Sequence, residues 1–312
     1  MAPLRSVRPV SQAPGAAATL DVVRAPGRAI TAAASTLVRP VLARPVTRCG
    51  VVAASRTAVH VATGDPELPV LSVVAPGGGR LPGACVLAGA PAGAALALAR
   101  LGAADHLLVG AGAVGLPDLL VVVRRWWSRP AVRMPDRDPD LRAGAEALSA
   151  ALGRAGRVMP PTVAEAADQL SDAIARDDDG EATRRAVHAM VGLGPGLTPA
   201  ADDVLAGALL CWYHLGLAEW PGAAASARTV LDAATERLDR TTAVSAALLH
   251  HASHGCSVPE ALVLLDALRT PPAVAAALEA LVDIGHDTGS SVAYGVLLGA
   301  RASVLTAERL AR

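Results

Sequence analysis

The chain has 312 residues, enough for one large or two ordinary domains, and 52% of them are hydrophobic. Its 28 basic and 28 acidic residues balance, which argues against nucleic acid or a membrane surface as a partner. All 28 basic residues are arginines, so a Schiff-base lysine and a Walker loop are excluded. The four cysteines are widely spaced and form no C-x-x-C pair, which indicates free thiols in a cytoplasmic protein without a zinc site.

The first 38 residues are expected to be poorly ordered. Residues 1–46 are rich in arginine, alanine and proline and contain a single acid, Asp21. This composition is also typical of a transit peptide. Because the whole chain is rich in arginine and alanine, a poorly ordered N-terminus is the preferred interpretation.

Residues 39–133 combine short β-branched runs with turn signals, which predicts a β-rich domain, either a small barrel or a sandwich. Strands are expected at 46–52, 57–63, 70–74, 107–109 and 119–123, and a short helix at 93–100. Trp126 and Trp127 close this part; they are expected to pack at a domain seam, although paired tryptophans can also stack on a ligand. Residues 134–139 are expected to be a linker.

Residues 140–312 change to helical periodicity. One apolar stripe consists of Val163, Ala166, Ala167, Leu170 and Ile174. Element lengths of 10–14 residues predict about eight helices. The predicted fold class is therefore α+β, with a β-rich N-terminal domain followed by an all-α C-terminal domain.

The most informative stretch lies inside the helical part. Residues 192–199 read Gly-Leu-Gly-Pro-Gly-Leu-Thr-Pro, and Asp202 and Asp203 follow at the start of an apolar run. Thr198 is expected to cap a helix and Pro199 to occupy its first position. Glycines permit positive φ and close approach to a ligand, and a helix N-terminus favours an anion. The alternative is a glycine turn with a cap and two acids that match the helix dipole.

Two further stretches, 240–242 and 285–291, also combine helix starts with hydroxyl groups. His286 is a candidate general acid or base, and an ordinary exposed histidine in a capping loop is the alternative. We expect both stretches to meet the 192–198 loop in one pocket, with Asp203 close to His286. His250, His251 and His254 lack the Glu of a metalloprotease motif, so a metal site there is the less favoured interpretation.

These blocks resemble the AllH-like family, which is associated with the subunits of oxamate carbamoyltransferase. The resemblance is specific over residues 190–300 and loose over 45–130, and it rests on the 192–203 stretch, 241–245 and 285–289. The sequence departs from the family pattern in two places. Ala200 and Ala201 stand where the family usually has Ser-Gly, and Ser290 and Ser291 stand where it often has Asp.

The resemblance implies carbamoyl transfer between oxalurate and phosphate, giving carbamoyl phosphate and oxamate, in purine or allantoin catabolism. Asp202 or Asp203 would orient the substrate amide, and His286 would move a proton. The expected partners are a small anion such as carbamoyl phosphate or oxamate and the other transferase subunits; no cofactor is expected. A non-catalytic anion-binding or scaffold subunit is the alternative. The candidate catalytic residues are Asp202, Asp203 and His286. The candidate substrate-binding residues are Gly192, Gly194, Gly196, Thr198, Arg240, Thr241, Thr242, Ser245, Thr288, Gly289 and Ser290.

Overall fold

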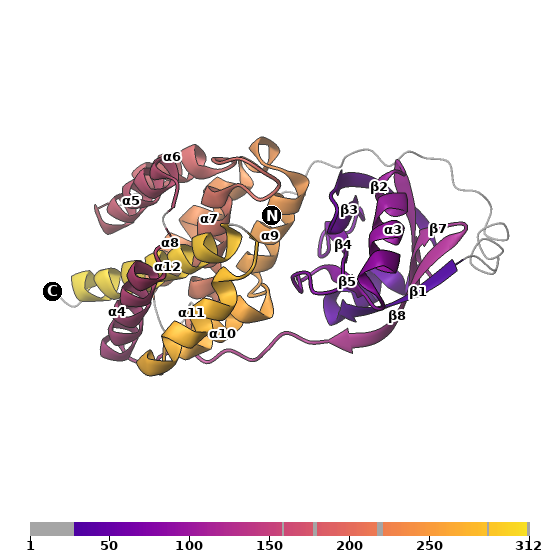
Figure 1. Ribbon diagram of the computed structural model, residues 1–312. Coiled ribbons are helices and arrows are strands. Elements are labelled where there is room, and N and C mark those ends of the chain that lie inside the picture. The colour runs from indigo at the N-terminus through magenta and orange to yellow at the C-terminus, as the bar shows by residue number, and fades with distance from the viewer. Residues whose placement is uncertain (1–27, 158, 177–179, 217–220, 286, 311–312) are drawn as a thin grey trace. The chain divides into compact units, whose positions relative to one another are not determined.

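The computed structural model describes residues 28–310 except positions 158, 177–179, 217–220 and 286 (Figure 1). The chain divides into two compact units, Met1–Ser128 and Arg129–Arg312. The division falls a few residues before the 134–139 stretch that the sequence suggests as a linker.

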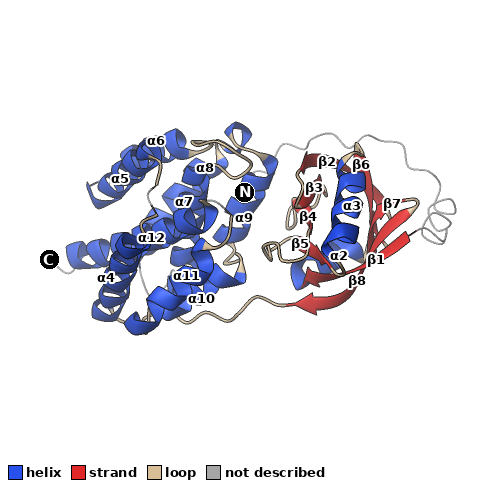
Figure 2. Ribbon diagram, in the orientation of Figure 1, coloured by secondary structure: helices blue, strands red, loops and turns tan. Residues whose placement is uncertain are grey.

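The first unit contains a closed barrel of eight strands, drawn in red in Figure 2. The strands are β1 (Arg28–Ser35), β2 (Thr47–Ala54), β3 (Ala58–Ala62), β4 (Val70–Val74), β5 (Ala84–Leu87), β6 (His106–Gly110), β7 (Ala113–Leu116) and β8 (Leu119–Trp127). They follow the order β1-β5-β4-β3-β2-β6-β7-β8, and a parallel β1–β8 pair closes the ring. Three helical segments accompany them: η1 (Thr36–Val38), α2 (Arg39–Leu42) and α3 (Pro91–Gly102).

Strand alternation shows how the barrel core forms. Successive side chains in a strand point to opposite faces, and Val59 and Val61 of β3 belong to the apolar core. His60, between them, is directly opposite Ser72 of β4, and their Nδ1 and Oγ atoms are 2.8 Å apart. Both side chains are buried, so this hydrogen bond offsets the cost of removing them from water.

The predicted fold class, a β-rich domain followed by an all-α domain, is wrong in its description of this half, because the eight strands form a closed barrel; of the two forms that the sequence left open, the barrel is the one present and the sandwich is not. Three strands of the barrel, β1, β5 and β7, were not predicted from the sequence. β1 reads Arg-Ala-Ile-Thr-Ala-Ala-Ala-Ser and lies within the range 1–38 expected to be poorly ordered. Its parallel partner β8 begins 91 positions later, so its pairing is a tertiary event that local periodicity does not encode.

The second unit is helical, as Figure 2 shows. Its described residues form nine α-helices and two short 3₁₀ segments, η2 (Leu238–Arg240) and η3 (Pro271–Ala273). The α-helices are α4 (Asp138–Ala155), α5 (Pro161–Arg176), α6 (Glu181–Met190), α7 (Ala200–Leu215), α8 (Pro221–Thr235), α9 (Ala243–Ser253), α10 (Pro259–Ala267), α11 (Val274–Val282) and α12 (Thr288–Leu310).

Helix α7 is the central element of this unit. Every residue from Ala200 to Trp212 is buried, including the acids Asp202 and Asp203. A helix that is buried all round lies inside a bundle, whereas α5 buries only the single stripe expected from its sequence. Helix α7 packs against α8, α9 and α12, and these contacts position the candidate site.

Candidate functional site

The 192–198 loop leads directly into α7. Gly192, Gly194 and Gly196 have φ angles of 79°, 120° and 97°, in the region that favours glycine. Pro199 is the N-cap of α7 and makes no side-chain cap hydrogen bond. The expected cap by Thr198 is therefore wrong; its hydroxyl lies 3.2 Å from the Thr288 hydroxyl at the start of α12.

Helices α7 and α12 run parallel: residues later in α7 contact residues later in α12. A methyl group on Gly295 would lie 2.0 Å from the carbonyl oxygen of Val204, and one on Gly299 would lie 2.9 Å from Cβ of Cys211. Such distances leave no space for a side chain, so glycine allows the two backbones to touch. The parallel direction brings the N-termini of both helices to the same end of the bundle.

Helix α9 also runs parallel to α7. Near the two starts, the Ser245 hydroxyl donates to Asp202 Oδ2 at 2.8 Å. Near the two ends, a ring nitrogen of His214, Nε2, lies 3.1 Å from the Gly255 carbonyl oxygen. The N-termini of α7, α9 and α12 therefore converge, as Figure 1 also allows the reader to follow. Each carries a partial positive charge, so their convergence favours a bound anion.

The three loops meet, as the sequence predicts. The Thr242 hydroxyl caps α9 by accepting from the backbone N–H of Ser245 and donates to the Leu197 carbonyl at 2.6 Å. A methyl group on Gly192 would lie 2.3 Å from the Arg240 carbonyl oxygen. Together with the contact between the Thr198 and Thr288 hydroxyls, these interactions join the 192–198 loop to both other helix starts.

Asp202 holds this junction together. Its Oδ1 accepts from the Gly192 backbone N–H at 2.8 Å. Its Oδ2 accepts from the hydroxyl groups of Thr241 and Ser245. The side chain is 1% exposed, and three hydrogen bonds satisfy its carboxyl group in that dry environment. Asp202 therefore ties the glycine loop to the start of α9.

Asp203 is in a different position, although it is the next residue. It is 3% exposed, and it has a hydrogen bond to the Thr288 side chain. Among the described residues, its Oδ2 has no hydrogen-bond partner. Burial raises the pKa of the Asp203 carboxyl well above its ordinary value; the Thr288 hydroxyl lowers it in part, and the negative charge of Asp202 raises it further. Asp203 is thus a buried acid directed towards the start of α12.

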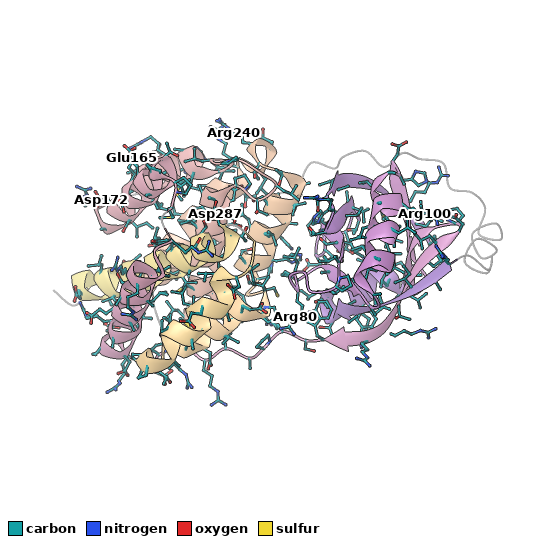
Figure 3. The ribbon with its side chains drawn as sticks, in the orientation of Figure 1. Arg80, Arg100, Glu165, Asp172, Arg240 and Asp287 are labelled. Atoms are coloured by element: carbon teal, nitrogen blue, oxygen red, sulfur yellow. The ribbon has the colours of Figure 1, made fainter. Side chains whose placement is uncertain are left out.

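The remaining candidates are Gly289 and Ser290 at the start of α12, the exposed Arg240, and His286. Gly289 fits closely, since a methyl group there would lie 1.9 Å from the Leu281 carbonyl oxygen. The Ser290 hydroxyl donates to the Asp287 carbonyl at 2.9 Å, at the start of α12. The Arg240 side chain is exposed, and Figure 3 shows it at the outer edge of the helical unit. His286 lies outside the described residues, so its predicted proximity to Asp203 stays a prediction.

Ser291 is not among the candidate residues predicted from the sequence. Ser291 is 1% exposed, and its hydroxyl has no hydrogen-bond partner among the described residues. It follows Thr288 by three positions and therefore lies on the same face of α12. The signal that could have indicated it is the pair Gly295 and Gly299, whose spacing of four marks the face of α12 that contacts α7.

A separate groove of about 510 Å³ lies between α5 and α6, and none of the candidate residues lines it. Its charged residues Asp172 and Arg185 make ion pairs with Arg176 and Glu181 on their own helices. Within the part of the chain that the structure describes, no group of three or more histidine, cysteine or acidic residues has the arrangement of a metal site. No described helix is both long and apolar enough to cross a membrane.

The geometry defines a junction of three parallel helix N-termini that contains two buried acids, Asp202 and Asp203. Residues 190–300 match the family model described as oxamate carbamoyltransferase subunit AllH, which confirms the resemblance inferred from the sequence. The match covers the 192–198 loop and the starts of α7, α9 and α12. No solved structure matches the chain.

Proposed function

We propose that this chain is a subunit of an enzyme of the oxamate carbamoyltransferase type and that it binds the small anionic substrate. The observation that carries the proposal is the convergence of α7, α9 and α12 at their N-termini, within the residues that match the family model. The reaction joins phosphate and oxalurate to give carbamoyl phosphate and oxamate. Both substrates are anions, so both need a site that replaces water around negative charge.

The transfer itself sets clear chemical requirements. A phosphate oxygen forms a bond to the carbamoyl carbon, the bond from that carbon to the oxamate nitrogen breaks, and the nitrogen takes a proton. The carbamoyl oxygen gains negative charge in between, which helix N-termini can stabilise. Neither a lysine nor a metal is required for these steps, and the chain contains no lysine.

Candidate roles follow from the positions of the acids. Burial raises the pKa of the Asp203 carboxyl well above its ordinary value, which favours the protonated form and suits Asp203 to give a proton to the departing nitrogen. His286 remains the second candidate for this role. Thr198 and Thr288 supply hydroxyl groups where the two helix starts touch, and they would bind anionic oxygens. Asp202 would keep the glycine loop in place.

The alternative is that this chain is a non-catalytic anion-binding or scaffold subunit. Ser290, the residue where the family often has an acid, donates its hydroxyl proton to the Asp287 carbonyl and offers no carboxyl group there. A scaffold role predicts that changes at Asp203 leave the turnover of the assembled enzyme unchanged, whereas an active-site role predicts a loss.

The test is reconstitution with the other transferase subunits. We expect the complete assembly to form carbamoyl phosphate from oxalurate and phosphate, and expect Asp203→Asn to lower kcat by at least about 100-fold, the lower range for a lost general acid. Asp283→Asn, an exposed acid at the end of α11, is the matched control and should retain full activity. An active Asp203→Asn assembly would support the scaffold role, and an inactive wild-type assembly would contradict the proposed function.

A further inference from the structure

The last part of β8 has an edge that no described strand covers. The register of the β7–β8 pair ends at Ala113 and Val122, whereas β8 continues to Trp127 (Figure 2). Over residues 123–127, which we refer to as the β8 overhang, β8 pairs with β1 alone among the described strands. Alternate residues of a strand direct their N–H and C=O groups to opposite sides, so about half of these groups in the overhang face the side that β7 leaves open.

The side chains of the overhang are exposed as well. Arg124, Arg125 and Trp126 are three successive exposed residues, although neighbours in a regular strand point to opposite faces. The β1–β8 register shifts at this point, where Arg124 has no partner in β1. Trp126 is 36% exposed, and Cζ of Arg39 lies 4.8 Å from the centroid of its ring in a cation–π contact. The overhang therefore presents open backbone groups, cationic side chains and an aromatic ring together.

The charge of this surface selects the kind of segment that fits it. The zero net charge of the chain conceals an uneven distribution, since residues 1–128 contain 12 arginines and five acids, and residues 129–312 contain 16 arginines and 23 acids. Arg124 and Arg125 make no ion pair within the part of the chain that the structure describes. Two copies of the overhang would place arginines against arginines, which is unfavourable across a strand pair. An acidic segment of another protein is the complementary occupant.

An extended peptide fits an open strand edge better than a nucleic acid does. The edge offers N–H donors and C=O acceptors in alternation, and a polypeptide strand supplies the complementary series. The phosphate oxygens of a nucleic acid accept hydrogen bonds from arginine but give no regular row of donors to the strand carbonyls. A peptide strand also places a side chain at every second residue on each face, so an apolar residue can cover Trp126.

We propose that the β8 overhang is a docking edge for an extended acidic segment of a partner protein. The segment adds a strand in the place that β7 leaves open. Its backbone pairs with residues 123–127, its carboxylates pair with Arg124 and Arg125, and an apolar side chain covers Trp126 beside Arg39. This inference assigns an interaction surface to the barrel, goes beyond the proposed function and does not depend on it.

Binding of synthetic peptides by the full chain tests the proposal. The probe is a fluorescein-labelled peptide of alternating glutamate and valine. One control peptide has lysine in place of glutamate, and the other is the acidic peptide with methyl groups on alternate backbone nitrogens, which keeps the charge and prevents strand pairing. We expect both controls to bind at least about tenfold more weakly than the probe, because like charges repel in the first and backbone donors are lost in the second. Hydrogen exchange with the bound probe should slow at residues 123–127.

A charge-reversal variant locates the site on the protein. Arg124→Glu combined with Arg125→Glu should weaken binding of the acidic probe by at least about tenfold and strengthen binding of the lysine peptide. Arg28→Glu combined with Arg56→Glu is the matched control, because both are exposed arginines of the barrel outside the overhang, one at the start of β1 and one between β2 and β3. This control should bind the acidic probe within about twofold of the wild type, since charges beyond a Debye length are largely screened.

Several outcomes would overturn the inference. The first is no binding of the acidic probe by the folded wild type, and the second is equal binding of the N-methylated peptide, which would leave charge alone as the cause. Equal losses in the two double variants, or slowed exchange confined to residues outside 123–127, would place the peptide elsewhere. Tighter binding of single-stranded oligouridylate, weakened only by the overhang variant, would assign the surface to nucleic acid. None of these measurements depends on carbamoyl transfer.

Discussion

The two ends of the parallel helices α7 and α9 have opposite chemistry. The end at which both helices start holds Asp202 and Asp203 with several hydroxyl groups. The end at which they finish holds His214 and Arg129, which bond to the Gly255 carbonyl at 3.1 and 2.7 Å. Both arrangements match the helix dipole, since acids stabilise N-termini and a cation such as Arg129 stabilises C-termini. Burial lowers the pKa of His214, so this ring contributes a hydrogen bond and not a charge.

The two ends differ in which buried polar atoms lack a hydrogen-bond partner among the described residues. At the C-terminal end, the carbonyl oxygens of His254 and Gly255 both accept from Arg129, so the helix end is satisfied within the unit. His251 keeps an unpartnered Nε2 there, but burial lowers the pKa of His251 to about 4, so the ring is neutral. At the N-terminal end, the unpartnered atoms among the described residues include Oδ2 of Asp203, an acid whose charged form is far costlier to bury. Dipole matching alone explains the C-terminal end and does not explain the N-terminal one.

The largest expected effect comes from breaking the parallel arrangement itself. Gly295→Ala places a methyl group 2.0 Å from the Val204 carbonyl oxygen, and three backbone atoms of α7 lie within 2.9 Å. We expect the free energy of unfolding to fall by about 3 kcal/mol, the upper range for overpacking. Gly153→Ala is the control, since its methyl group meets nothing within 4 Å in the last turn of α4, and it should be neutral or slightly stabilising. Denaturant unfolding of both variants measures the difference; equal stabilities would contradict the close contact.

The C-terminal end should be sensitive to acid through His251. Its folded pKa of about 4 lies below the unfolded value of 6.5, so the unfolded chain binds the proton first as pH falls. The stability that the neutral ring provides is present above pH 6.5 and is lost as pH falls towards 4. The neighbouring His250 and His254 oppose the charge as well. Relative to His251→Gln, the wild type should lose up to roughly 3 kcal/mol across this interval. A constant difference between the two proteins from pH 7 to 4 would contradict the burial of a neutral ring.

At the N-terminal end, replacing Asp202 or Asp203 by asparagine should change the free energy of unfolding by different amounts. Asp202→Asn removes charge from a group with three hydrogen-bond donors, and we expect a loss of about 2 kcal/mol at pH 7, the middle of the range for charged hydrogen bonds. Asp203→Asn should cost less, and its relative stability should improve with rising pH. The reason is that the raised pKa of Asp203 makes the folded wild type retain a proton that the unfolded chain releases above about pH 4. Thermal unfolding of both variants from pH 5 to 8 tests the distinction, and indistinguishable curves would contradict it.

Much of the candidate site could be read from the sequence because its signals are local. Glycines at 192, 194 and 196 are needed for the positive φ angles of one loop, and Thr242 caps α9 through a residue three positions away. The α5 stripe follows the period of the helix. Strand β4 occupies the predicted range 70–74. In each case the physical cause acts within about one helical turn or one strand, and the residue pattern records it.

The tertiary structure alone decided the rest. Barrel closure depends on alanine-rich β1 pairing with distant β8, and no local pattern contains that partner. The sequence placed Asp202 and Asp203 together as acids near a helix start, whereas only packing shows that one is fully hydrogen-bonded and the other is not. Ser291 became a candidate only because α12 lies parallel to α7. Helix direction and side-chain satisfaction depend on which surfaces fit against one another, and that fit joins residues about 90 positions apart, such as Thr198 and Thr288.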